Sequence, residues 1–119
     1  MAIGDWGNSN GFLRETVITI ESTSPERDFN ILLGDNIYPK GVSSADDPQL
    51  RIFPDIVARD TSSIYHVILR IHDYMQSIDA HISYSAVDQR WDLPAGYYSR
   101  FYKIDDVNLC LIFVDTVNF

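Results

Sequence analysis

The stretch "ILLGDNIYPKGV" at residues 31–42 is the most informative part of the sequence for the fold. An apolar run ends abruptly in Gly34-Asp35-Asn36, and Tyr38 follows three places after the aspartate. The stretch "AIGDWG" at residues 2–7 repeats this ending, an apolar residue followed by Gly-Asp. Glycine and aspartate favour tight turns. The two stretches therefore predict two strands, each of which ends in a turn that carries a carboxylate.

The composition describes an acidic, globular chain of 119 residues. Hydrophobic residues make up 45% of it, and 17 acids against 9 bases give a net charge of −8. This length suits one domain with a modest core. A negative surface repels phosphate backbones and anionic lipids, which argues against nucleic-acid and membrane partners. No apolar stretch is long enough to span a bilayer, and no secretory leader is visible.

Apolar and polar segments alternate along the chain in a pattern that predicts an α/β layered fold. Residues 12–21 fit either a helix or a strand, because a run of β-branched residues weakens the helical interpretation. Asp47 is suited to cap a helix, and Pro48 to occupy its first turn. The remaining predicted elements are strands that end at Asp35 and Asp73 and a loosely helical segment at 77–91.

A closing pair of strands is predicted near the end of the sequence. Residues 97–104 alternate between aromatic and polar side chains, residues 105–108 form a turn, and residues 109–116 are almost wholly apolar. A continuous apolar run indicates a strand that is buried on both faces. We therefore expect the second strand to be fully buried, with the lone Cys110 as a small hydrophobe inside it.

The ends of the predicted strands bring acidic residues together. Three apolar runs end in a turn with an aspartate, at Asp5, Asp35 and Asp73, and a fourth run, at Asp115, is a candidate for the same ending. Ligand sites of α/β sheets gather at the carboxyl ends of the strands. Carboxylates that share one rim repel one another unless a cation sits among them. The pattern therefore predicts a cation site at that rim.

The ordered set of motifs resembles a known family. "GDWG", "FNILLGDNIYPKGV", "YHVILRIHD", "YSAVDQRWDLPAGYY" and "LIFVDT" follow the order and spacing of the purple acid phosphatases, most closely the small tartrate-resistant type of calcineurin-like metallophosphoesterase. The resemblance implies the N-terminal part of a β-sandwich flanked by helices, with a metal site at the carboxyl ends of the strands. It also implies hydrolysis of phosphate monoesters, on small molecules or phosphopeptides, by iron paired with a second iron, zinc or manganese. Members of this family are commonly secreted or lysosomal.

The resemblance assigns roles to individual residues. Asp5 would bind a ferric iron, Asp35 would bridge both metals, and Tyr38 would bind the iron as phenolate. These are hard oxygen donors, which suit a hard and highly charged ion. His72 would contact the substrate and serve the leaving group, and Asp73 would orient that histidine.

The third motif departs from the family pattern. Where the family has Gly-Asn-His followed by Asp or Glu, this chain has Arg70-Ile71-His72-Asp73. Ile71 has no lone pair for a metal, and Arg70 places a large cation where the backbone must turn tightly. The family domain also continues to later histidine ligands beyond the segment that this chain resembles. We therefore expect very weak hydrolysis or none from the chain alone.

The sequence leaves a second function open: a non-catalytic remnant that binds at most one metal ion or acts as an interaction module. Exposed sheet edges would allow such a chain to self-associate. Four other residues are interpreted as structural. His66 belongs to a strand, His81 to a solvated helix face, Trp6 to the packing, and Asn36 to the backbone of its turn.

Overall fold

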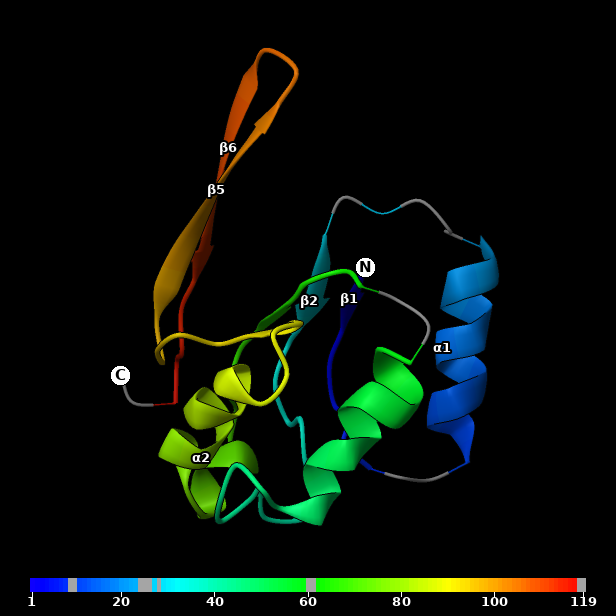
Figure 1. The fold of residues 1–119 in the computed structure, drawn as a ribbon, viewed down its shortest axis with the longest axis vertical. Helices are drawn as coiled ribbons and strands as arrows, with labels where there is room; N and C mark the ends of the chain where they lie inside the picture. Colours follow the sequence, from blue (N-terminus) through cyan, green and yellow to red (C-terminus); the bar gives the residue numbers. More distant parts are fainter. Residues whose placement is uncertain (9–10, 24–26, 28, 60–61, 118–119) are drawn as a thin grey trace.

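The computed structural model describes residues 1–8, 11–23, 27, 29–59 and 62–117. Its centre is a parallel sheet of four short strands in the order β1 (Ala2–Ile3), β2 (Asn30–Leu32), β3 (Tyr65–Val67) and β4 (Trp91–Asp92). The register places Ile31 of β2 between Ala2 and His66. All four strands point the same way, so their carboxyl ends meet at one edge (Figure 1). This arrangement confirms the predicted α/β fold.

Helical segments cover one face of the sheet. They are α1 (Phe12–Thr23), η1 (Pro48–Arg51), η2 (Phe53–Val57), η3 (Asp73–Met75), α2 (Ile78–Ser83) and η4 (Tyr84–Ala86). The first segment is a helix rather than a strand. Its buried residues Leu13 and Val17 lie four positions apart, the spacing that places two side chains on one face of a helix. Asp47 caps η1 by accepting a hydrogen bond from the Gln49 amide, as the sequence predicts.

The core lies between the helical segments and the sheet. Trp91 is fully buried and forms edge-to-face contacts with Trp6, Phe53 and Tyr84. The hydroxyl of Tyr65 donates to the Val57 carbonyl at 3.0 Å, which ties β3 to η2. Edge-to-face packing of this kind stabilises beyond the area buried. These contacts fix the parallel sheet, and with it the carboxyl edge of the sheet, against the helical segments.

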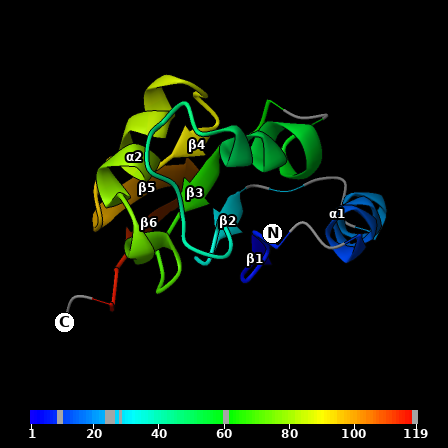
Figure 2. The same ribbon diagram turned by 90° about the horizontal axis from the view of Figure 1, so that it is seen from below.

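A hairpin covers the opposite face of the sheet (Figure 2). It consists of β5 (Tyr98–Ile104) and β6 (Val107–Phe113), which pair antiparallel and project well beyond the body. His66 of β3 bonds to the Tyr102 hydroxyl and packs on Phe113, whereas its neighbour Tyr65 faces the helical segments. Successive residues of a strand face opposite sides. The parallel sheet is therefore the middle layer of three.

The prediction that residues 109–116 form a fully buried strand is wrong. Only one side of the hairpin contacts the body, and along β6 the side chains are exposed or half-buried until Phe113. Cys110, predicted to be buried, is exposed. A continuous apolar run needs neighbours on both faces to be buried, and the described residues place no layer over the outer face. Among the described residues, no helix is long and apolar enough to cross a membrane.

Candidate metal centre

Two Gly-Asp turns form the base of the site at the carboxyl edge of the sheet. Asp5 follows β1 and Asp35 follows β2, and both adopt left-handed backbone angles, with φ of 53° and 52°. Aspartate tolerates this region because its short side chain can bond locally. The Asp5 amide donates to the Gly34 carbonyl at 3.1 Å, and the Gly7 amide donates to the Asp35 carbonyl at 3.2 Å. These two hydrogen bonds lock the turns together, so the two carboxylates lie side by side.

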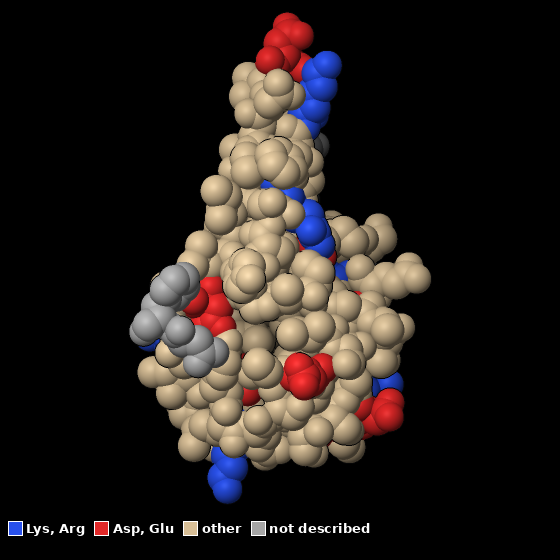
Figure 3. Space-filling model, turned by 90° about the vertical axis from the view of Figure 1, so that its left-hand side faces the viewer, with Lys and Arg blue, Asp and Glu red and all other residues tan. Residues whose placement is uncertain are grey.

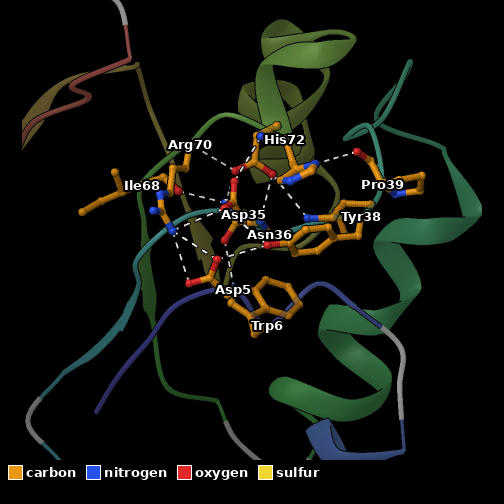
Figure 4. Close-up of polar contacts among 11 residues, drawn as sticks. Asp5, Trp6, Asp35, Asn36, Tyr38, Pro39, Ile68, Arg70 and His72 are labelled. Carbon is orange, nitrogen blue, oxygen red and sulfur yellow. Dashed lines mark hydrogen bonds and ion pairs between the residues drawn. The ribbon is translucent and has the colours of Figure 1, made fainter.

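Tyr38 completes a group of three oxygen donors (Figure 4). Its hydroxyl lies 3.1 Å from Oδ1 of Asp5 and 3.3 Å from Oδ2 of Asp35, and it donates to these oxygens. Burial, then the hydrogen bond to Asp5 and the negative charge of Asp35, raise the pKa of the Tyr38 phenol to about 12. Without a cation that displaces its proton, this phenol stays neutral and acts as a hydrogen-bond donor.

Arg70 lies in the same group. It follows β3, and its Nη1 atom lies 3.1 and 3.2 Å from the two carboxylate oxygens of Asp5 and 3.4 Å from Oδ2 of Asp35. The side chain is half exposed, whereas that of Asp35 is almost completely buried. The positive charge beside the two carboxylates in this structure is therefore the guanidinium of Arg70, and a metal site at these strand ends stays a prediction.

The second oxygen of Asp35 has a partner in the third turn. Oδ1 of Asp35 accepts from the backbone amide of His72 at 3.0 Å. The His72 ring leans on Tyr38, with ring centroids 4.3 Å apart, and its Nδ1 lies 2.7 Å from the Pro39 carbonyl. The ring is thereby held beside the three oxygen donors.

Asp73 is a buried anchor beneath the site. Its Oδ1 accepts from the amides of Asn36 and Ile37 at 2.9 and 3.3 Å, and its Oδ2 accepts from the Asn36 side chain at 2.9 Å and the Arg70 amide at 3.0 Å. Burial raises the pKa of this carboxyl to about 6, against the opposing effect of the amide hydrogen bonds. Within the described residues no hydrogen bond joins Asp73 to the His72 ring, so its predicted orienting role stays a prediction.

Two of the four residues interpreted as structural, Trp6 and His66, are confirmed. The prediction for Asn36 is wrong in its partner, because its side chain bonds to Trp6, Ile68 and Asp73 and not to the backbone of its own turn. Trp6 is buried and donates to the Asn36 side chain at 2.9 Å, and Asn36 in turn donates to the Ile68 carbonyl. His66 is buried and paired with Asp92 at 2.7 Å. The prediction of a solvated His81 is wrong.

His81 is fully buried against Trp91 and lies 3.9 Å from Asp73. The loose helical spacing of residues 77–91 predicts a helix with His81 on its solvated face. Instead α2, capped by Ser77, turns its histidine inward, and a tryptophan lies over the ring. Burial lowers the pKa of His81 to about 4.

The donor set fits one hard cation and not two. The Tyr38 phenol lies within hydrogen-bond distance of both carboxylates, and this set of three oxygen donors suits a single highly charged ion. Ile71, at the position expected to supply an amide oxygen to a second ion, is exposed and has no donor atom. In the part of the chain that the structure describes, no group of three or more His, Cys, Asp or Glu residues is placed to hold a metal. Among the described residues no hydrogen bond joins Asp115 to the three donors, and its carboxylate instead accepts from the Val117 amide.

The sequence of the chain is similar to those of the purple acid phosphatases. Tartrate-resistant acid phosphatase type 5 of Sus scrofa is 30% identical to 98% of the chain, which covers 38% of that enzyme. Purple acid phosphatase 4 of Arabidopsis thaliana is 30% identical to all of it, with 36% of that enzyme covered. The chain therefore spans about two fifths of the length of these curated relatives. It matches no protein-family model.

A solved structure shares the fold at lower sequence identity. It is described as "GAP50 the anchor in the inner membrane complex of Plasmodium" and superposes with a TM-score of 0.73 at 20% identity. The match covers 97% of this chain and 41% of that one. This likeness concerns the fold, whereas the curated relatives are acid phosphatases by name.

The sequence did not predict that Arg70 pairs with the carboxylates of the site. The sequence shows Arg70 as an obstacle to the turn, but the structure pairs its side chain with Asp5, which lies 65 positions away. The signal available was positional, because Arg70 follows the third strand of a parallel sheet just as Asp5 and Asp35 follow the first two. Residues at adjacent parallel strand ends meet at one edge.

Proposed function

We propose that this chain carries the oxygen-donor part of a phosphate-monoester hydrolase centre, in which Asp5, Asp35 and Tyr38 hold one metal ion. The observation that carries the proposal is the convergence of these three side chains at the carboxyl edge of the sheet. The acid phosphatase relatives supply the reaction class. When bound, a ferric iron would polarise a phosphoryl oxygen and lower the pKa of a bound water, and a second iron, zinc or manganese ion would need donors beyond the residues described.

The remaining residues of the site would position the substrate. The His72 ring is held at Nδ1 by the Pro39 carbonyl, so its Nε2 is left to face a phosphate ester or its leaving group. Asp73 would act through the backbone, since it fixes the amides of Asn36 and Arg70 on either side of the site. Because Ile71 supplies no donor, we expect this chain alone to hydrolyse phosphate monoesters very weakly or not at all.

Metal content and absorbance test this function. Purified chain loaded with ferric iron should hold one ion per chain and show a visible tyrosinate charge-transfer band. The variant Tyr38→Phe should lose the band, and Tyr97→Phe, at an exposed tyrosine of the hairpin, should keep it. Hydrolysis of p-nitrophenyl phosphate is measured in parallel. A colourless, metal-free chain after loading would contradict the proposal.

A specific observation favours the alternative, a non-catalytic interaction module. The outer face of the hairpin is apolar and exposed, and it is lined by Tyr97, Phe101, Cys110, Ile112 and Val114. Figure 3 shows this part of the surface as largely uncharged, with acidic and basic side chains at the tip and basic side chains along one edge. Exposed apolar patches of this kind mark interaction surfaces.

For this alternative we propose self-association of two copies through the outer face. The double variant Phe101→Ser and Ile112→Ser should sediment as a monomer at concentrations where the parent chain associates. The control Ile18→Ser removes an exposed apolar side chain from α1 and should leave association unchanged. A parent chain that stays monomeric at every concentration would contradict the alternative.

A further inference from the structure

Arg70 holds a position that the packing around it defines closely. Its amide donates to the buried Asp73, and a Cβ atom built on Gly34 would lie only 2.5 Å from the Arg70 Cβ. Its backbone is therefore confined from two sides. The side chain is free of such confinement, since half of its surface is exposed to solvent. The backbone of Arg70 is fixed at the rim, whereas its guanidinium can rotate away.

A single atom of Arg70 makes all the contacts with the acidic pair. Nη1 lies within 3.4 Å of three carboxylate oxygens, two from Asp5 and one from Asp35. The Tyr38 hydroxyl touches two of the same oxygens. One positive nitrogen thus lies at the point where the three oxygen donors converge. Two carboxylates held this close repel each other strongly unless a positive charge offsets them.

We propose that Arg70 is the resident counter-cation of the Asp5–Asp35 pair and that a metal ion binds these residues only by displacing the guanidinium. The metal half of this inference rests on the function proposed above, which makes Asp5, Asp35 and Tyr38 the ligands. The counter-cation half rests on the ion pairs alone. Metal affinity is then set by competition, and it rises when the guanidinium is removed.

The first experiment measures metal binding. Mn²⁺, Zn²⁺ and Fe³⁺ are titrated separately into the parent chain and into Arg70→Gln, Arg70→Lys and Arg51→Gln, with circular dichroism to verify the fold. Arg70→Gln should bind metal about tenfold more tightly than the parent, because a competing unit charge is gone. Arg70→Lys retains the charge and should stay close to the parent. The control Arg51→Gln breaks an exposed ion pair with Asp55 and should change nothing at the site.

The second experiment needs no metal. Urea unfolding in the presence of a chelator is measured for Arg70→Gln, Asp5→Asn and the double variant. Coupling is expected: Arg70→Gln should lower the folding equilibrium constant by at least about fivefold in the parent and by clearly less in Asp5→Asn, where one repelling charge is absent. Additive effects would overturn the counter-cation role.

The outcomes separate this inference from the proposed function. Equal metal affinity in the parent chain and Arg70→Gln would overturn displacement while leaving the metal site in place. If the urea experiment shows coupling between Arg70 and Asp5 but neither the parent chain nor Arg70→Gln binds metal, both the displacement of Arg70 and the proposed metal site are overturned. Arg70 would then be a permanent counter-ion. Coupling together with tighter metal binding by Arg70→Gln supports both halves.

Discussion

The parallel sheet and the hairpin both contain strongly apolar strands, but the strands differ in how far they are buried. Every residue of β3 is buried, with helical segments on one face and the hairpin on the other. In β6 an equally apolar run is mostly exposed, because only its inner side meets the body. The difference shows that apolar composition predicts a strand well but predicts its burial only when neighbours cover both faces.

Matched aromatic truncations give the largest contrast between the two regions. Phe53 is fully buried beneath the sheet, whereas 78% of Phe101 on the hairpin is exposed. Phe53→Ala should lower the free energy of unfolding by about 3–5 kcal/mol, because it leaves a cavity in the core. Phe101→Ala should change it by no more than about 0.5 kcal/mol. Urea unfolding measures both. Similar losses from the two variants would mean that the hairpin face is covered in solution.

The two buried groups whose pKa values shift most usefully for a test, His81 and Asp73, both lie in the body of the molecule and not in the hairpin. The pH dependence of stability therefore reports on the body. The folded pKa of His81 is lowered from 6.5 to about 4, so the unfolded chain binds its proton first and stability falls as pH drops through this range. The folded pKa of Asp73 is raised from 3.8 to about 6, so the folded chain binds its proton first and stability rises as pH drops from about 6 to 3.8. The two effects oppose each other between about pH 6 and 4.

The variant His81→Leu should therefore expose the contribution of Asp73. Relative to the parent, it should gain stability on acidification from pH 6 to 4, with a slope difference of up to about 1.4 kcal/mol per pH unit. Urea unfolding at a series of pH values measures the slope. Parallel slopes in parent and variant would show that His81 titrates alike in the folded and unfolded chains.

A smaller effect is expected where the hairpin joins the body. Arg100 of β5 donates from Nε to Asp92 of β4 at 2.8 Å, and the same carboxylate lies 2.7 Å from His66. Arg100→Gln should cost about 1 kcal/mol, since the pair is partly exposed to solvent. The loss should be local, with faster hydrogen exchange of the β5–β6 amides and unchanged exchange in β3. A uniform increase across both regions would contradict a separable hairpin.

The smallest effect concerns Cys110 on the exposed face of the hairpin. Cys110→Ser should change the free energy of unfolding by less than about 0.5 kcal/mol, as is usual for exposed positions. The thiol of the parent should react with a water-soluble disulfide reagent without prior unfolding. Protection of the thiol under native conditions would place a covering partner over this face.

The sequence was sufficient for the features that depend on local order. The strand ends at Asp5 and Asp35, the cap at Asp47 and the layered α/β class all follow from turn residues and apolar runs. The sequence did not predict burial correctly where burial depends on which element packs against a side chain. His81 has no partner hydrogen bond in the described structure and is held by packing under Trp91, which periodicity does not reveal. The prediction for Cys110 was wrong for the converse reason: its apolar neighbours predict burial, but the described residues place no layer over its face of the hairpin.

The candidate site divides in the same way. Parallel strand order brings Asp5, Asp35 and Tyr38 together, and sequence reasoning named all three. Their role as metal ligands, and the catalytic roles of His72 and Asp73, stay predictions. The position of Arg70 after the third parallel strand was a signal that it lies at this edge, but the sequence does not show which carboxylates its side chain contacts.

The contact at Gly34 has a consequence for how this rim can change over evolutionary time. The turn that bears Asp35 and the turn that bears Arg70 abut so closely that a single methyl group on Gly34 would collide with the next turn. The backbone of this rim therefore tolerates little change, whereas a replacement of the half-exposed Arg70 side chain would change the charge of the rim.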